Sequence, residues 1–100
     1  MSAAQPLAEP ELALAAVLHR ALLSAAAGDE GRTLTPVSLA LDFGELKGEP
    51  LPADVQARID RATRSLVFVS GEVRDDAGLL LVAGSAVFGV EAEAQTSAAV

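Results

Sequence analysis

The sequence contains no cysteine, no tryptophan and no tyrosine, and its three aromatic residues are all phenylalanine. The absence of cysteine excludes disulfides, thiolate zinc sites and cysteine nucleophiles. With so few aromatic side chains, the core has to be built from leucine, valine and alanine, and hydrophobic residues make up 51% of the chain. That share is large for 100 residues, so we expect part of the apolar surface to be covered by a partner subunit.

Basic residues are also scarce. Seven lysines and arginines stand against 14 aspartates and glutamates, which gives a net charge of −7. Such a chain repels a phosphate backbone, so we expect no nucleic acid partner. There is one histidine, no Gly-x-Ser-x-Gly motif and no phosphate-binding glycine loop before a helix, so the sequence predicts no metal ion and no cofactor.

The N-terminal region lacks the features of a secretory signal or a membrane span. Glu9 and Glu11 precede its apolar run, where a secretory signal carries positive charge. His19 and Arg20 then interrupt the run before it reaches the roughly 20 apolar residues that a span requires. We therefore expect a cytoplasmic protein that does not associate with a membrane.

A helix is predicted over residues 11–27. Pro10 and Glu11 suit its start, because proline is tolerated in the first turn and a carboxylate stabilises the positive end of the helix dipole, and Gly28 suits its end. At 100° per residue, one face of this helix is apolar and should pack on the rest of the protein. That face consists of Leu14, Val17, Leu18, Ala21, Leu22 and Ala25.

The rest of the sequence predicts strands separated by turns. Val37, Leu39, Leu41 and Phe43 alternate with smaller or polar residues, as in a strand with one buried face. The apolar stretch 79–90 predicts a strand that is covered on both faces. The strands are predicted at 35–43, 55–61, 66–74 and 79–90, with a long loop at 44–54, a turn at 62–65 and a hairpin at 75–78.

This order of elements predicts an α+β protein with a single domain over residues 1–90. Residues 91–100 are small or polar without periodicity and are expected to form a flexible tail. The stretch from Val55 to Val90, VQARIDRATRSLVFVSGEVRDDAGLLLVAGSAVFGV, resembles hotdog-fold acyl-CoA thioesterases of the phenylacetate-degradation type. It matches their two central strands, which are joined by a basic turn and followed by an Arg-Asp-Asp-x-Gly hairpin.

The resemblance covers about residues 9–90 and implies both a fold and a function. One long helix would be wrapped by a curved antiparallel sheet of about four strands, and two subunits would pair so that their sheets become continuous, giving a dimer or a tetramer. The ligand would be acyl-CoA or a related acyl thioester. A small sheet with exposed apolar edges favours pairing with a like chain on physical grounds as well.

The sequence departs from this family at the active site. Family members carry a strand before the helix, a His-Gly-Gly turn at the helix start and an acidic residue two turns later. Alignment of the helices places the turn at residues 10–12 and the acidic residue at His19, so both signatures are missing and the N-terminus is shorter. Thioester hydrolysis needs a base to activate water and a hydrogen-bond donor to polarise the carbonyl. A backbone N–H can still act as the donor when the side chains differ, but the base has to come from a suitable side chain.

Two residues are candidates for the missing base. His19 is one, because an imidazole accepts a proton near neutral pH; the alternative is a boundary residue of the helix without a catalytic role. Glu11, or Glu9 if the alignment is shifted, is the other; the alternative is that these carboxylates only stabilise the helix dipole. Glu11 and His19 are therefore the predicted catalytic residues.

Three arginines surround the predicted turn at 62–65. Arg58, Arg61 and Arg64 are where relatives present basic groups to the phosphates of coenzyme A, and guanidinium groups suit that role. The alternative is a solvated turn whose arginines balance Asp60. The sequence thus predicts a thioesterase-like protein; the alternative is a dimer without catalysis that binds an acyl ligand or a protein partner, including a complete hotdog chain that supplies the missing residues.

Overall fold

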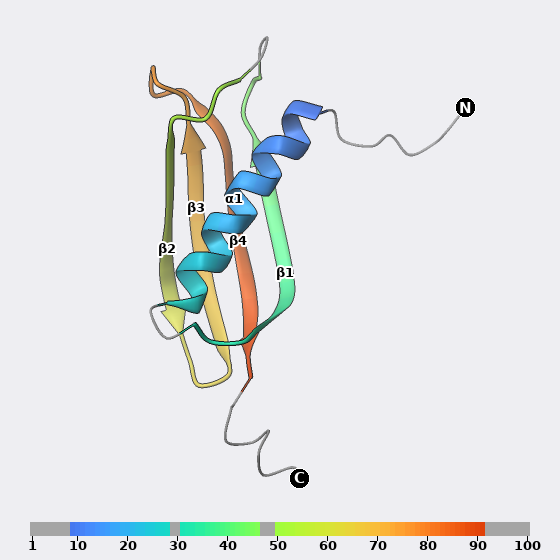
Figure 1. The fold of residues 1–100 in the computed structure, drawn as a ribbon, viewed down its shortest axis with the longest axis vertical. Coiled ribbons are helices and arrows are strands. Elements are labelled where there is room, and N and C mark those ends of the chain that lie inside the picture. The colour runs from blue at the N-terminus through green and yellow to red at the C-terminus, as the bar shows by residue number, and fades with distance from the viewer. Residues whose placement is uncertain (1–8, 29–30, 47–49, 92–100) are drawn as a thin grey trace, which may run out of the picture.

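The structure, a computed structural model, consists of one helix and one antiparallel sheet (Figure 1). It describes residues 9–28, 31–46 and 50–91. The tail predicted at 91–100 therefore lies outside the described residues, apart from Glu91. The elements are α1 (Glu9–Ala27), β1 (Leu34–Phe43), β2 (Asp54–Ala62), β3 (Leu66–Arg74) and β4 (Leu80–Val90).

Helix α1 begins two residues before its predicted start and ends at the predicted residue. Glu9 and Glu11 both lie in its first turn, where their charges complement the helix dipole. At the other end Gly28 has a φ of 67°, which glycine adopts without strain, and its N–H donates to the Ser24 carbonyl. The Arg32 guanidinium donates to the Ala26 carbonyl at 3.0 Å and so satisfies one of the last carbonyls of the helix.

The four strands form one sheet in the order β1-β4-β3-β2, and every neighbouring pair is antiparallel. Strands β2, β3 and β4 follow one another as a meander, whereas β1 pairs with β4 on the far side. Strands β1 and β2 are thus the two edges of the sheet. The predicted α+β class, with one long helix on an antiparallel sheet of four strands, is confirmed.

The core lies between α1 and one face of the sheet. Figure 1 shows the helix crossing that face diagonally. Burial of each leucine there contributes about 1.5–3 kcal/mol to stability. The helix contributes Leu14, Leu18, Leu22 and Ala26 to the core, and the sheet contributes Val67, Val69, Val73, Leu81, Val82, Ala86 and Phe88. The predicted apolar face is therefore the one that packs on the sheet, with Ala26 added.

One glycine, Gly84, lets the helix lie close to the sheet. Gly71 of β3 pairs with Gly84 of β4 on the face that α1 covers. A Cβ added at Gly84 would lie 2.7 Å from the Ala40 carbonyl oxygen and 3.2 Å from a methyl group of Leu18. The absence of a side chain at Gly84 therefore makes room for the Leu18 side chain.

Three register shifts change the faces that simple alternation predicts. They leave Val37, Asp60 and Leu81 without a pairing partner in the sheet. The face predicted to run from Val37 to Phe43 therefore does not include Val37, which is 59% exposed. A β-bulge places two successive residues opposite one, so the alternation is interrupted at that point.

The prediction that the last strand is covered on both faces is wrong for the part of the chain that the structure describes. Strand β4 has a neighbour at each edge, but α1 covers only one of its faces and Ser85 on the other is exposed. The shift at Leu81 buries both Leu81 and Val82, and Ala83 and Gly89 are small. A bulge and small residues therefore produce the continuous apolar stretch.

By length and composition alone, α1 qualifies as a candidate membrane span, with a mean hydropathy of 1.2. The core helix of a folded domain passes the same test. In this structure Leu14, Leu18 and Leu22 are buried against the sheet. Packing on the sheet therefore accounts for this stripe of α1, and 22% of the apolar window is buried.

Candidate functional site

Glu11 combines two features of a candidate base. It lies in the first turn of α1, close to the backbone N–H groups that have no partner within the helix. Its side chain is half-buried, and its Oε1 atom is buried without a hydrogen-bond partner among the described residues. Buried polar atoms are nearly always hydrogen-bonded, so this oxygen retains the capacity to accept a hydrogen bond from a ligand or a water molecule.

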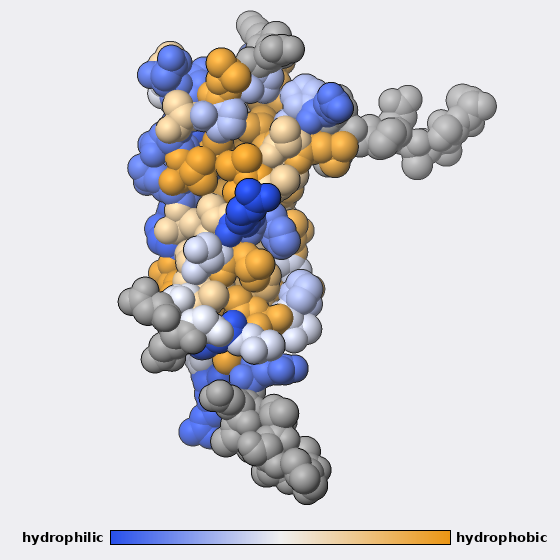
Figure 2. Space-filling view, in the orientation of Figure 1, coloured by the Kyte–Doolittle hydropathy of each residue, from blue (hydrophilic) through white to orange (hydrophobic). Residues whose placement is uncertain are grey.

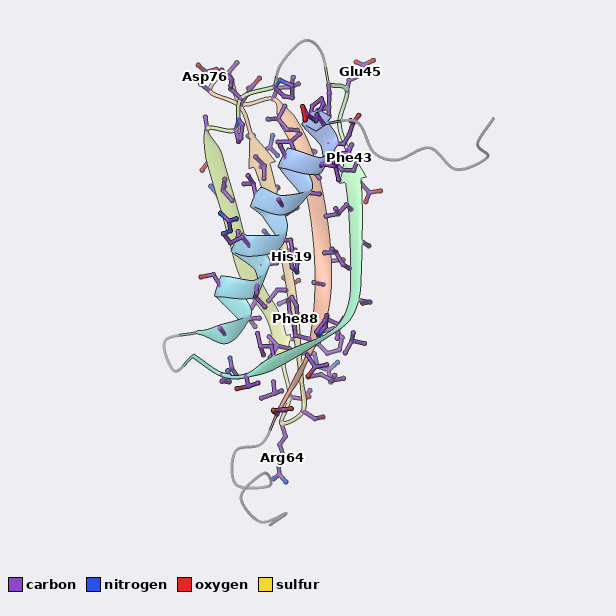
Figure 3. The ribbon with its side chains drawn as sticks, turned by 45° about the vertical axis from the view of Figure 1, so that its right-hand side comes forward. His19, Phe43, Glu45, Arg64, Asp76 and Phe88 are labelled. Carbon is purple, nitrogen blue, oxygen red and sulfur yellow. The ribbon has the colours of Figure 1, made fainter. Side chains whose placement is uncertain are left out.

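His19 lies two turns further along α1, on the exposed side of the helix. Figure 3 shows it midway along the helix, with Phe88 of β4 below it. The two rings are 6.5 Å apart between centroids and are inclined at 37°. Eight residues separate Glu11 from His19, or about 12 Å along the helix axis, so the two side chains do not form a hydrogen-bonded pair.

The three arginines lie on β2 and on the turn after it. Cross-strand partners share a face of the sheet, and Arg58 pairs with Ser70 while Arg61 pairs with Phe68. Val67, Val69 and Val73 of β3 point towards α1, so Ser70 and Phe68 lie on the opposite face together with both arginines. Arg64 lies in the turn between β2 and β3, at the end of the sheet (Figure 3).

Two of these arginines already have contacts within the chain. Arg58 Nε is 3.7 Å from Asp60 Oδ1, and the same oxygen accepts a hydrogen bond from the Ser70 hydroxyl at 3.0 Å. The Arg61 guanidinium carbon is 6.0 Å from the centre of the Phe68 ring. The Arg58 side chain is 62% exposed, and an ion pair this exposed is weak. A phosphate group could therefore displace Asp60 at little cost.

The predicted site residues do not meet within one protomer. Glu11 and His19 belong to the helix side of the sheet, whereas Arg58 and Arg61 lie on the opposite face. A ligand that contacts both sets has to pass around the edge of the sheet or lie between two protomers. Sequence position alone did not reveal on which face of the sheet each of these residues lies.

A pocket at one end of the sheet was not predicted. It has a volume of about 200 Å³ and lies between the loop after β1 and the hairpin that joins β3 to β4. Figure 3 shows Glu45 and Asp76 at this end of the molecule. The pocket is lined by Glu45, Pro50, Leu51, Asp75, Asp76, Leu79 and Leu81. Its three carboxylates would repel a phosphate, which excludes it as the site for coenzyme A phosphates.

The two segments that form this pocket are about 25 residues apart in the sequence, and alternation does not reveal that they adjoin. Asp75 has a structural role there, because its Oδ1 atom accepts hydrogen bonds from the N–H groups of Ala77 and Leu79. Within the described ranges, no cluster of three or more histidine, cysteine or acidic side chains could hold a metal ion.

Comparison with known proteins rests on structure. No protein-family model matches this sequence, and no curated protein does. The BH2602 protein from Bacillus halodurans, crystallised with CoA, superposes with a TM-score of 0.67 at 18% identity, over 79% of this chain and 56% of its own. A protein from Lactococcus lactis, yhdA, provisionally described as a thioesterase, gives 0.61 at 17% identity, over 89% of this chain and 70% of its own.

The chain has the hotdog fold. It spans just over half of the length of the Bacillus halodurans hotdog protein. In this fold α1 is the central helix, and it packs on the sheet that the four strands form. Glu11 lies at the start of this hotdog helix, and no aspartate or glutamate follows it within α1.

Proposed function

We propose that this chain is a thioesterase-like protein that binds acyl-CoA or a related acyl thioester. The observation that supports the proposal is the hotdog fold, which the chain shares with a protein crystallised with CoA and with one provisionally described as a thioesterase. A fold alone does not determine chemistry, so the proposal also rests on the residues around α1.

In the catalytic form of this proposal, Glu11 acts as the base. Its carboxylate accepts a proton from a water molecule, and the resulting hydroxide adds to the thioester carbonyl carbon. The C–S bond then breaks as the protonated Glu11 returns its proton to the leaving sulfur, which releases the thiol. The free N–H groups at the start of α1 are suited to stabilise the negative charge on the carbonyl oxygen. His19 is the second candidate base; it is exposed but about 12 Å from the first turn.

Arg58, Arg61 and Arg64 are proposed to contact the phosphates of coenzyme A. Arg58 and Arg61 project from the same face of β2, and Arg64 follows in the adjoining turn, so the three charges form one basic strip. In a chain with a net charge of −7, this strip is where a polyanionic ligand meets the least repulsion.

The second candidate function is binding without hydrolysis. One observation favours it: in α1, the acidic residues are confined to the first turn. The carboxylate that the resemblance predicts two turns along the helix is replaced by His19. In that case the chain holds an acyl ligand or a protein partner, or pairs with a complete hotdog chain that supplies the base.

Self-association is part of both candidate functions. We propose a dimer or a tetramer in which the sheet is extended by a second copy. Large apolar side chains are exposed on the helix and on both edge strands, among them Leu12 (51%), Leu39 (47%) and Ile59 (43%). Figure 2 shows hydrophobic residues gathered at the surface on the helix side. Such patches are typical of interfaces between subunits.

Hydrolysis of a panel of acyl-CoA substrates, followed by release of free thiol, tests the proposal. If Glu11 is the base, Glu11→Gln lowers kcat by at least about 100-fold, because general bases contribute a factor of that size. His19→Ala should then change kcat little, whereas the reverse pattern would identify His19 as the base.

Glu45→Gln is the matched control for Glu11→Gln, because it removes an exposed carboxylate outside the helix. It should leave kcat unchanged. Saturable binding of acyl-CoA without turnover in the wild type would support the binding function. Neither binding nor turnover with any member of the panel would contradict both the catalytic function and the binding of an acyl ligand.

A further inference from the structure

Phe68 is an aromatic side chain on the face of the sheet that the helix does not cover. Its neighbours along β3, Val67 and Val69, are buried towards α1, so alternation directs Phe68 to the opposite face, where it is half-buried. Phe88, by contrast, lies in the core and is 2% exposed. Packing under the helix therefore explains Phe88 but does not explain why an aromatic residue stands at position 68.

The Phe68 ring has different neighbours on its two sides. On the β4 side its cross-strand partner is Val87, and the diagonal neighbours on the same face are Ser85 and Gly89. These two residues are small, so no long side chain of β4 lies diagonally across from the ring. On the β2 side its partner is Arg61. The ring is therefore bordered by short side chains on one side and by a cation on the other.

The Arg61 guanidinium lies over the ring of Phe68, with its central carbon 6.0 Å from the ring centre. This distance is the outer limit of a cation–π contact, so the direct attraction between the two groups is weak. A planar group stacked between them requires about 7 Å, because each pair of stacked layers is about 3.5 Å apart. Arg61 is exposed, and a movement of its side chain by about 1 Å provides that space.

The arginines at this end of the open face are only partly neutralised. Within the described ranges, neither Arg61 nor Arg64 forms an ion pair. Arg58 lies three residues before Arg61 on the same face, and its partner Asp60 is itself exposed. Three arginines against Asp60 and, after β4, Glu91 leave this part of the surface positive in a chain whose total charge is −7. An anionic ligand is therefore favoured here.

We propose that Phe68 is the stacking platform for the adenine base of coenzyme A, with the Arg61 guanidinium on the other side of the base. Aromatic and guanidinium planes both stack on nucleotide bases. The inference rests on the proposed function for the identity of the ligand, and it adds which part of the ligand is recognised. A nucleic acid strand is disfavoured as the ligand, because the rest of the surface is acidic.

The nucleotide end of coenzyme A has phosphates on both sides of its ribose, a diphosphate at the 5′ oxygen and a single phosphate at the 3′ oxygen. Arg58 and Arg64 lie on β2 before Arg61 and in the turn after it, so cations flank the platform in both directions along the chain. Since β2 is an edge strand, the pantetheine arm has to pass around only this one strand to reach the helix side of the sheet.

Fluorescence of the variant Phe68→Trp tests the platform directly, since the natural chain contains no tryptophan. The probe is adenosine 3′,5′-bisphosphate, which carries the base and phosphates at both ribose positions but no thioester. Stacking of the base on the indole should cause a saturable loss of its emission. Inorganic pyrophosphate, which supplies phosphates without a base, should cause no such loss. Equal loss with the two ligands, or no loss with either, would overturn the platform.

The affinity for the same nucleotide, measured by calorimetry on the full chain, should be about tenfold lower for Phe68→Leu than for the wild type, because stacking on an aromatic ring contributes a factor of that size. Phe43→Leu is the matched control, since it removes a ring that packs against the core at the opposite end of the molecule from Arg64 (Figure 3). It should leave the affinity unchanged, and circular dichroism verifies that both variants are folded. Equal affinities of Phe68→Leu and the wild type, or equal losses in the two variants, would overturn the inference.

Acyl-pantetheine, which carries the thioester without the nucleotide, separates this inference from the proposed function. Binding of acyl-pantetheine by a wild-type chain that does not bind the nucleotide would overturn the platform and leave the proposed function intact. Binding of the nucleotide through Phe68, without binding of any acyl thioester, would support the platform and contradict the proposed function.

Discussion

At the scale of the residue, Gly71 of β3 meets a strict steric requirement. An added Cβ there would overlap the Gln56 carbonyl oxygen and lie 3.1 Å from the Ala57 Cα, both backbone atoms of β2. Backbone atoms in a paired strand cannot move away as a flexible side chain can. Glycine at this position therefore maintains the pairing of β3 with β2, beneath the helix.

Gly71→Ala should lower the free energy of unfolding by about 2 kcal/mol, because the added methyl group overpacks the sheet. Urea denaturation followed by circular dichroism measures the change. Gly89→Ala is the control, since a Cβ there would meet its nearest neighbour at 3.8 Å, an ordinary contact. It should change stability by less than about 0.5 kcal/mol, and equal losses for the two variants would contradict the steric explanation.

Asp75 and Asp76 are neighbours in the hairpin between β3 and β4 with different roles. Asp75 Oδ1 accepts two backbone hydrogen bonds, at 3.0 and 2.8 Å. Asp75→Ala should therefore cost about 1–3 kcal/mol of unfolding free energy, because two N–H groups lose their acceptor. Asp76→Ala should cost less than about 0.5 kcal/mol, since Asp76 is exposed. Thermal unfolding compares them, and a larger loss at Asp76 would contradict the assigned roles.

For the candidate site residues, the sequence pattern predicted the position on the helix but not the burial of individual atoms. Helical spacing predicted that His19 lies at the flank of the apolar face, and the structure places it on the exposed side of α1. The burial of Glu11 Oε1 depends on tertiary packing, which spacing cannot reveal. Whether Glu11 and His19 act in catalysis stays a prediction.

At the scale of the element, α1 is held by one narrow stripe of side chains. Leu22 is fully buried, whereas its neighbour Leu23 is 38% exposed. Leu22→Ala should lower the free energy of unfolding by about 2–5 kcal/mol, because it leaves a cavity between helix and sheet. Leu23→Ala, the same change one residue along, should cost less than about 1 kcal/mol. Chemical denaturation measures both, and similar losses would show that α1 packs through a different face.

The strands show where the alternation of side chains predicts the buried face correctly and where it does not. The predicted range 66–74 is the observed range of β3, whose side chains alternate along its whole length between buried and half-buried. Strands β1, β2 and β4 each contain a register shift, and there the predicted faces fail locally. A bulge depends on the geometry of the partner strand, so a single sequence does not reveal it. The pairing of β1 with β4 is likewise a long-range contact that local patterns leave undetermined.

At the scale of the whole molecule, the fold was predictable and the site was not. The order of one helix and four strands, with a meander at the end, predicted the α+β class, and the resemblance of residues 9–90 to hotdog thioesterases predicted the hotdog fold. The site requires knowledge of which face each residue occupies, and Arg58 lies on the opposite face from Glu11. The exposed apolar side chains of both edge strands are the observation on which the proposed self-association rests.

The central claim is that this hotdog chain binds acyl thioesters. Isothermal titration calorimetry with a medium-chain acyl-CoA, with free CoA and with the matching fatty acid tests it most directly. The account predicts saturable binding of acyl-CoA, weaker binding of free CoA, and about tenfold or greater loss of affinity when Arg58, Arg61 and Arg64 are all replaced by glutamine, because the phosphates lose their cationic partners. No saturable binding of any acyl-CoA by the folded wild-type chain would contradict it.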